Sequence, residues 1–309
     1  MTLPARPDTL CRSTSGLLAL LALAAGCGGP VSEGEEELGT LAQGLTRGAW
    51  TFEGDALDAY TQTDAQADFG SLASWTSTNQ ITVGSSEGNE YLRVKLPSST
   101  EDIGAKFRPR LWTSGEYATA TVRWRVFLEP GWDFYSGDIK MAGVGGGKNY
   151  TGGAGDLARS NCDGWSLRFV FSGTPNNKLY AYYYGCDMAG LYSGGQVYGD
   201  KLGTGCAVTV GEWYTLLIST QANTSSQSNG RLRMWVRREA TGAVCTVLST
   251  DTRRLANDTS LSSLHENYPS LWNAEVFRGG AGTPPAEDHY VRIDDVLWNN
   301  YFYSTAPSL

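Results

Sequence analysis

Five side chains that could bind an anion or move a proton lie close together in the sequence. They fall within residues 164–185 and are Ser166, Arg168, Tyr180, Tyr182 and Tyr184. An arginine can bind a carboxylate through two parallel hydrogen bonds, and a positioned phenol can transfer a proton. Together they could hold a polyanionic ligand while a proton moves. The structural alternative is that tyrosines simply favour the pleated surface of a sheet, where a phenol tolerates partial exposure.

A β-hairpin over residues 164–185 would bring these side chains to one face. Apolar and polar residues alternate through residues 165–172 and again through residues 179–184, which predicts two strands joined by the turn-rich segment between them. Pairing Phe171 with Leu179 sets Arg168 opposite Tyr182, Ser166 opposite Tyr184, and Val170 opposite Tyr180. The sequence therefore predicts a polar cluster on one open face of a sheet.

Lys140 is a further candidate, from the middle of residues 131–147. This segment has too many glycines for a helix and is too long for a tight turn. It predicts a long ordered loop, and loops on a rigid sheet commonly carry functional residues. The alternative for an isolated lysine is an ordinary solvated side chain.

The composition limits the class of partner. With 309 residues, 38 glycines, 16 tyrosines and 10 tryptophans, the chain is long enough for one large all-β domain. Its net charge of −8 argues against nucleic acid as a partner. An anionic polymer could be bound only by a local concentration of basic side chains. We expect a monomer.

The N-terminal segment predicts export. Residues 1–26 have the pattern of a signal peptide, with Arg6 and Arg12 before an apolar run too short to remain as a membrane-spanning helix. The run ends in Leu-Ala-Ala-Gly before Cys27, which resembles the lipobox of bacterial lipoproteins and predicts lipidation of Cys27 and an anchor in the outer membrane of the cell envelope. The alternative is an ordinary secreted protein cut near Ala25. Residues 27–48, with an acidic run, predict a flexible tether, and residues 49–309 the folded domain.

Four cysteines remain in the predicted domain: Cys162, Cys186, Cys206 and Cys245. An even number in an exported chain predicts two disulfides. In the hairpin register, Cys162 faces a position within two residues of Cys186, so these two cysteines are predicted to pair. Cys206 and Cys245 then pair by elimination.

The rest of the chain predicts an all-β fold. Alternating segments occur at residues 91–96, 119–128, 211–218 and 230–236, and no segment has a sustained helical period. We therefore predict an antiparallel β-sandwich. Its first and last strands are expected side by side, where Glu53 and Asp294 could hold a structural calcium ion; the alternative is solvated acidic turns. No other metal or cofactor is expected, because His265 and His289 lack the spacing of a catalytic zinc site.

Several segments, taken in order, resemble polysaccharide lyase family 14, the alginate and polyglucuronate lyases built on a concanavalin-like jelly roll. The matching segments are Trp132-Asp-Phe134, residues 137–144, Ser166-Leu-Arg168 and Tyr180-Ala-Tyr182. The likeness covers residues 119–298. The sequence departs from the family pattern after Lys140, where Met-Ala stands in place of Leu-Pro, and after Arg168, where no second arginine follows.

The resemblance implies an enzyme that cleaves an anionic uronate polysaccharide by β-elimination, without a required cofactor. It implies catalytic roles for Lys140, Tyr180 and Tyr182, and binding of the substrate carboxylate by Ser166 and Arg168. The predicted register adds Tyr184, opposite Ser166, to the substrate-binding residues. Either Tyr180 or Tyr182 would transfer the proton, while Lys140 would share that transfer or stabilise the enolate-like intermediate. The sequence does not assign the acid and the base, or the uronate polymer.

Two other functions fit the same fold. A non-catalytic carbohydrate-binding protein would need the aromatic residues but not the convergence of Lys140, Ser166 and Arg168. A glycoside hydrolase would need two facing carboxylates, and the predicted face of the hairpin offers none.

Overall fold

The computed structural model describes residues 47–76, 80–98, 104–112, 116–134, 137–147, 162–171, 177–188, 199–224, 226–257, 260–261, 264–265, 267–279 and 285–307. All of them fall within the second of the two units into which the chain divides, Glu37–Leu309. The predicted signal peptide, Cys27 and nearly all of the predicted tether lie outside the described residues. Within the described part of the chain, no helix is long and apolar enough to cross a membrane.

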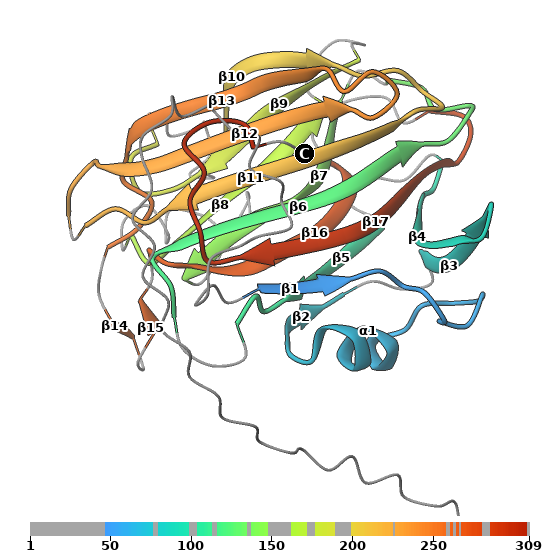
Figure 1. Cartoon of the computed structure of the whole chain (residues 1–309), viewed down its shortest axis with the longest axis horizontal. Coiled ribbons are helices and arrows are strands. Elements are labelled where there is room, and N and C mark those ends of the chain that lie inside the picture. The colour runs from blue at the N-terminus through green and yellow to red at the C-terminus, as the bar shows by residue number, and fades with distance from the viewer. Residues whose placement is uncertain are drawn as a thin grey trace, which may run out of the picture. The chain divides into compact units, whose positions relative to one another are not determined.

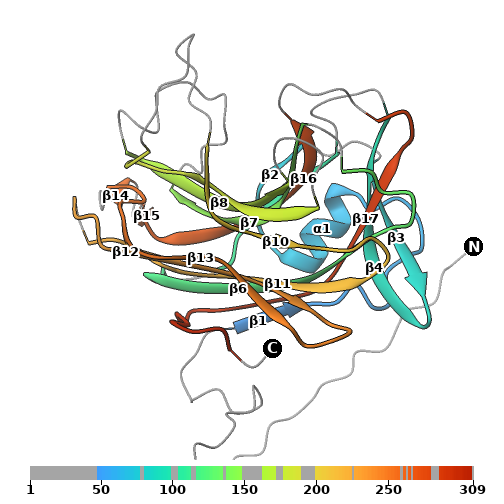
Figure 2. The same ribbon diagram turned by 90° about the horizontal axis from the view of Figure 1, so that it is seen from above.

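Two antiparallel sheets lie face to face, which confirms the predicted β-sandwich (Figures 1 and 2). One sheet has the spatial order β13 (Val244–Arg253), β12 (Gly230–Arg238), β11 (Trp213–Gln221), β6 (Thr119–Leu128), β17 (His289–Asn299), β4 (Asn89–Leu96) and β3 (Ile81–Ser86), with β1 (Arg47–Trp50) paired to β17. The other has the order β10 (Asp200–Ala207), β9 (Lys178–Tyr184), β8 (Gly164–Phe171), β7 (Asp138–Gly147), β16 (Pro269–Gly279), β5 (Gly104–Pro109) and β2 (Leu72–Trp75). The short strands β14 (Ser260–Leu261) and β15 (Leu264–His265) pair with each other.

The hydrophobic core lies between the sheets and is rich in aromatic rings. Trp124 of β6, Trp165 of β8 and Trp272 of β16 are all fully buried. The Trp124 and Trp272 ring centroids are 6.4 Å apart, so the two layers contact each other through large rings. The inner face of the seven-stranded sheet packs in the core. Because side chains alternate along a strand, the polar residues of this sheet can lie on its outer face.

One helix, α1 (Gln62–Phe69), corrects the expectation that the chain has no helical segment. Thr61 caps the helix: its hydroxyl accepts a hydrogen bond from the backbone N–H of Asp64, and the Asp64 carboxylate accepts one in return. Only Ala65 and Phe69, one turn apart, are buried. Two apolar residues are too few to show a helical periodicity in the sequence. The Thr-x-x-Asp pattern at residues 61–64 does indicate the start of a helix.

The first and last strands pair as predicted, with Trp50 opposite Val296. The carboxylates proposed there as calcium ligands accept hydrogen bonds from the protein instead. Glu53 accepts the backbone N–H of Glu90, and Asp294 accepts the side-chain amide of Asn89 at 2.7 Å. Within the described residues, no group of three or more His, Cys, Asp and Glu side chains could hold a metal ion.

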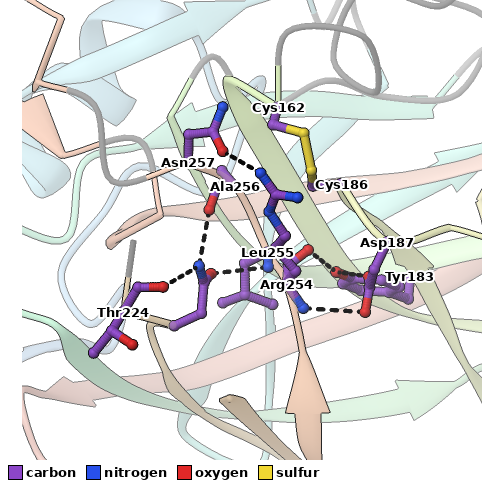
Figure 3. Close-up of a disulfide and its surroundings, with 10 residues drawn as sticks. Cys162, Tyr183, Cys186, Asp187, Thr224, Arg254, Leu255, Ala256 and Asn257 are labelled. Atoms are coloured by element: carbon purple, nitrogen blue, oxygen red, sulfur yellow. Dashed lines mark hydrogen bonds between the residues drawn. A yellow bond between two sulfur atoms is a disulfide. The ribbon is translucent and has the colours of Figure 1, made fainter. Parts of the chain in front are cut away.

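Both predicted disulfides are present, Cys162–Cys186 and Cys206–Cys245. The second joins β10 to β13, the edge strands of the two sheets, and so closes one side of the sandwich. The first closes the end of the β8–β9 hairpin (Figure 3). Just beyond β9, Asp187 accepts hydrogen bonds from the Tyr183 hydroxyl at 2.8 Å and from the backbone N–H of Arg254 at 3.0 Å.

His289 links the start of β17 to the segment that leads into β7. Its ring stacks on Trp132, with centroids 5.1 Å apart, and its Nε2 accepts a hydrogen bond from the backbone N–H of Asp133. Burial and the nearby charge of Arg278 lower its pKa to about 4, against smaller opposing effects of Asp133 and Asp288. His289 is therefore neutral in the folded protein at neutral pH.

We predict that this histidine makes the fold sensitive to mild acid. The unfolded chain binds a proton at His289 near its ordinary pKa of 6.5 and the folded chain only near 4, so stability falls as the pH decreases through this window. The expected loss between about pH 7 and about pH 5 is about 2 kcal/mol of unfolding free energy. Urea unfolding at both pH values measures it. A His289→Gln variant should lose less over the same window, and an equal loss would show that other groups cause the effect.

Candidate active site

Lys140 lies on a central strand, which corrects the prediction of a loop. Residues 138–147 form β7, between β8 and β16 in the seven-stranded sheet. Glycines are normally depleted in strands, which is why the segment reads as a loop. Here they mark a close approach of backbones instead. A Cβ on Gly143 would lie 2.1 Å from the carbonyl oxygen of Leu167, and one on Gly146 would lie 2.0 Å from that of Tyr268.

A β-bulge in β7 directs Lys140 to the outer face of the sheet. Lys140 pairs with Val170 and Gly143 pairs with Arg168, so two residues of β7 stand opposite the single residue Phe169 of β8. In a regular strand, positions 140 and 143 would point to opposite faces. The extra residue brings both to the same face as Arg168.

The hairpin has the predicted register. Arg168 pairs with Tyr182, Ser166 with Tyr184, and Val170 with Tyr180. The prediction that this face is open is wrong for most of the predicted site residues of the hairpin: Ser166, Arg168, Tyr182 and Tyr184 are buried, and of the five only Tyr180 is partly exposed. Tyr184 also packs with the hydrophobic core cluster. These four side chains therefore lie largely out of contact with water, in an environment where charges interact more strongly than in water.

Lys140 and Tyr182 lie next to each other on this face. The ammonium nitrogen is 5.1 Å from the centroid of the Tyr182 ring and 5.6 Å from that of Phe277, and the side chain is only 11% exposed. Its distance to the nearer oxygen of Asp138 is 3.8 Å. The Tyr182 hydroxyl oxygen accepts a hydrogen bond of 2.8 Å from the backbone N–H of Gly199.

Arg168 is 2% exposed and uses only part of its hydrogen-bonding capacity. Its Nη1 contacts Oε2 of Glu275 at 2.5 Å. Its Nε and Nη2 are buried and have no hydrogen-bond acceptor among the described residues. These two N–H groups form one edge of the guanidinium. In other proteins this edge commonly binds a carboxylate through two parallel hydrogen bonds. Burial lowers the pKa of Arg168, and Glu275 offsets only part of that effect.

Glu275, on β16, was not predicted from the sequence. Its Oε1 accepts a hydrogen bond of 2.7 Å from Nε of Arg108 and forms an ion pair with Nη2 at 2.6 Å, while Oε2 forms an ion pair with Nη1 of Arg168. Burial alone would raise the pKa of Glu275, but the charges of Arg168 and Arg108 outweigh it and lower the pKa overall. Glu275 is therefore ionised between two arginines.

The face carries more positive than negative charge, although the chain is acidic as a whole. Among the described residues of these strands, the face bears the cationic side chains Lys106, Arg108, Lys140, Arg168, Lys178 and Lys201 and the carboxylates Asp138 and Glu275. Lys106 lies over the ring of Phe277 at 4.3 Å, and Lys201 lies over the ring of Tyr180 at 4.8 Å. This is the local basic surface that a polyanion would require.

The comparisons with known proteins agree with this geometry. The family model of polysaccharide lyase 14 matches residues 85–262, more than half of the chain. The chain belongs to polysaccharide lyase family 14. No curated protein sequence matches it.

Solved structures of alginate lyases have the same fold as this family 14 chain. The alginate lyase Aly36B superposes with a TM-score of 0.64 at 23% identity, covering 82% of this chain and 96% of its own. The family 14 alginate lyase from Aplysia kurodai has a TM-score of 0.64 at 16% identity, covering 81% of this chain and 97% of its own. The jelly-roll architecture is therefore shared over nearly the full length of both enzymes.

We predict that Gly143 is essential for the arrangement of this family 14 site. In a Gly143→Ala variant the new methyl group meets the backbone of β8, including the Cα of Arg168 at 2.6 Å, so β7 and β8 must separate. The expected loss is about 1–3 kcal/mol of unfolding free energy, measured by urea denaturation.

Gly84→Ala in β3 is the matched control. There the nearest atoms to the new methyl group belong to the ring of Tyr91, a side chain, rather than to the backbone of a neighbouring strand. We expect a smaller loss of unfolding free energy than in Gly143→Ala. Equal effects of the two variants would contradict a special role for Gly143.

Proposed function

We propose that this protein cleaves an alginate-like uronate polysaccharide by β-elimination. The observation that carries the proposal is the juxtaposition of Lys140 and Tyr182 with the unpaired edge of Arg168, on one basic face. Membership of a lyase family and the likeness to alginate lyase structures support the same conclusion.

The residues fit the three requirements of the reaction. The C6 carboxylate of the uronate must be neutralised, and the Nε–Nη2 edge of Arg168 would bind it, with Ser166 beside it. The proton on C5 must be removed, and Tyr182 as a phenolate would accept it. The C4–O4 bond then breaks as the C4–C5 double bond forms, and the leaving oxygen takes a proton from Lys140 or Tyr180. Water is not consumed, and Lys140 also stabilises the negative charge that develops in the intermediate.

The alginate complexes of Aly36B support the choice of Lys140 and Tyr182. They were obtained with variants in which a lysine was replaced by alanine together with either a tyrosine or a methionine. The lysine and the tyrosine are 42 positions apart, the interval between Lys140 and Tyr182 in this chain. The lysine and the methionine are 28 positions apart, the interval between Lys140 and Arg168. This chain would thus present an arginine where Aly36B has a methionine.

We predict that Tyr182→Phe and Lys140→Ala each lower turnover by roughly 10²- to 10⁴-fold, because each removes a group that transfers or stabilises charge in the transition state. Tyr180→Phe tests the second phenol. Arg168→Ala should raise KM as well, because its carboxylate contact would exist in the ground state too. The measurement is the ultraviolet absorbance of the unsaturated product formed from a panel of polyuronates.

Tyr183→Phe is the control for this series, since it removes a phenolic oxygen from the core side of the same strand, where the hydroxyl donates to Asp187. It should change stability but not turnover. If the wild-type protein binds polyuronates and never releases an unsaturated product, it is a carbohydrate-binding protein without lyase activity. If it cleaves them and Tyr182→Phe keeps full activity, the site lies elsewhere.

We further propose that the protein is exported and anchored by a lipid on Cys27, on the basis of the apolar run and the Ala-Ala-Gly-Cys sequence that ends it. The expected mature N-terminus is a lipid-modified Cys27, detected by mass spectrometry of the membrane fraction of a bacterial host. A mature protein that begins near Ala25 or carries an unmodified Cys27 would refute the anchor.

A further inference from the structure

Arg168 reaches Glu275 across an intervening strand. Arg168 is on β8 and Glu275 on β16, and β7 runs between them. The path is free of side chains because Gly143 is the residue of β7 that pairs with Arg168, and a Cβ there would lie 2.9 Å from the Cγ of Arg168. A glycine on the central strand thus permits a long-range ion pair between two non-adjacent strands.

This ion pair fixes the orientation of the guanidinium. The group is planar and rigid, so binding of Nη1 by Glu275 determines where the Nε–Nη2 edge points. That edge is buried without an acceptor among the described residues, an arrangement that costs free energy unless a ligand completes it. Glu275 is itself held from the other side by Arg108.

The charges in this cluster are not balanced. Arg108 and Arg168 carry two positive charges and Glu275 one negative charge, and all three are buried or mostly buried. One further carboxylate would offset part of this excess of positive charge, to which Lys106, the residue opposite Glu275, also contributes. A uronate carboxylate fits both the charge and the two-donor edge.

We propose that Glu275 is a positioning residue: it holds Arg168 so that the free edge of the guanidinium receives the carboxylate of one uronate unit. This proposal rests on the proposed function for the identity of the ligand. Glu275 does not contact the reacting atoms, because both of its oxygens are bound by arginines. Its effect on the reaction acts through Arg168.

The test compares Glu275→Gln with Asp294→Asn. Asp294 is also a buried carboxylate, 3.4 Å from Nη1 of Arg125, but it lies on β17 in the other sheet. Both variants remove one negative charge from a buried ion pair, so both should lose stability. Only Glu275→Gln should raise KM for alginate, by at least about tenfold, and it should raise the Kd of an alginate trisaccharide by a similar factor.

A double variant separates positioning from a general loss of structure. If Glu275 acts through Arg168, adding Glu275→Gln to Arg168→Ala should change KM by less than about threefold, because the residue being positioned is already absent. Independent tenfold losses in the two variants would overturn the proposal. Glu275→Asp keeps the charge and serves if the glutamine variant does not fold; it should retain part of the affinity.

Side-chain NMR gives a readout that does not depend on activity. In the wild-type protein the Arg168 Nε–H should exchange slowly with water, and in Glu275→Gln it should exchange at least about tenfold faster, with no change in Asp294→Asn. If the exchange and KM are both unchanged, Glu275 has only a structural role. If the wild-type protein neither binds nor cleaves any polyuronate, the proposed function fails, while the exchange rates still decide whether Glu275 fixes Arg168.

Discussion

A buried cation must be paired, and the burial of Arg168 determines much of the arrangement around it. An isolated charge in a protein interior is too costly to keep, so Arg168 requires a nearby carboxylate. Glu275 supplies it, and its second oxygen is free to bind Arg108. The ion pair in turn requires a glycine at position 143, since any side chain there would occupy the path of the arginine. One electrostatic requirement thus explains residues on four neighbouring strands.

The bulge in β7 solves a second geometric problem. A strand directs alternate side chains to opposite faces, and the core needs Met141 and Val144. Without the extra residue, a strand that places Val144 in the core would also place Lys140 there. The bulge lies between Lys140 and Val144 and reverses the alternation of side chains between them. Val144 therefore points into the core, while Lys140 points to the outer face and lies next to Tyr182.

The hairpin could be predicted from the sequence because its information is local. Alternation set the two faces, the turn set the register, and the register then placed Cys162 near Cys186. The role of Glu275 could not be predicted in this way. It lies 107 positions from Arg168, and its strand becomes a neighbour only through the sheet order β8-β7-β16. Lys140 was recognised as a candidate but was assigned to a loop. A local sequence pattern does not distinguish the glycines of a loop from glycines in a strand that allow two backbones to approach each other.

The burial of these side chains could not be predicted from the local sequence either. Alternation indicates which side chains share a face of the sheet but not which residues cover that face. This burial bears on function. In a low-dielectric environment, a lysine and an arginine act on a neighbouring phenol and on a bound carboxylate with much less screening than at an exposed surface. The chain as a whole has a net charge of −8 and would repel a polyuronate at long range. The polyuronate binding proposed here would therefore depend on the short-range contacts of the basic face. Added salt would weaken the long-range repulsion more than it weakens the buried contacts, because screening acts mainly on exposed charges.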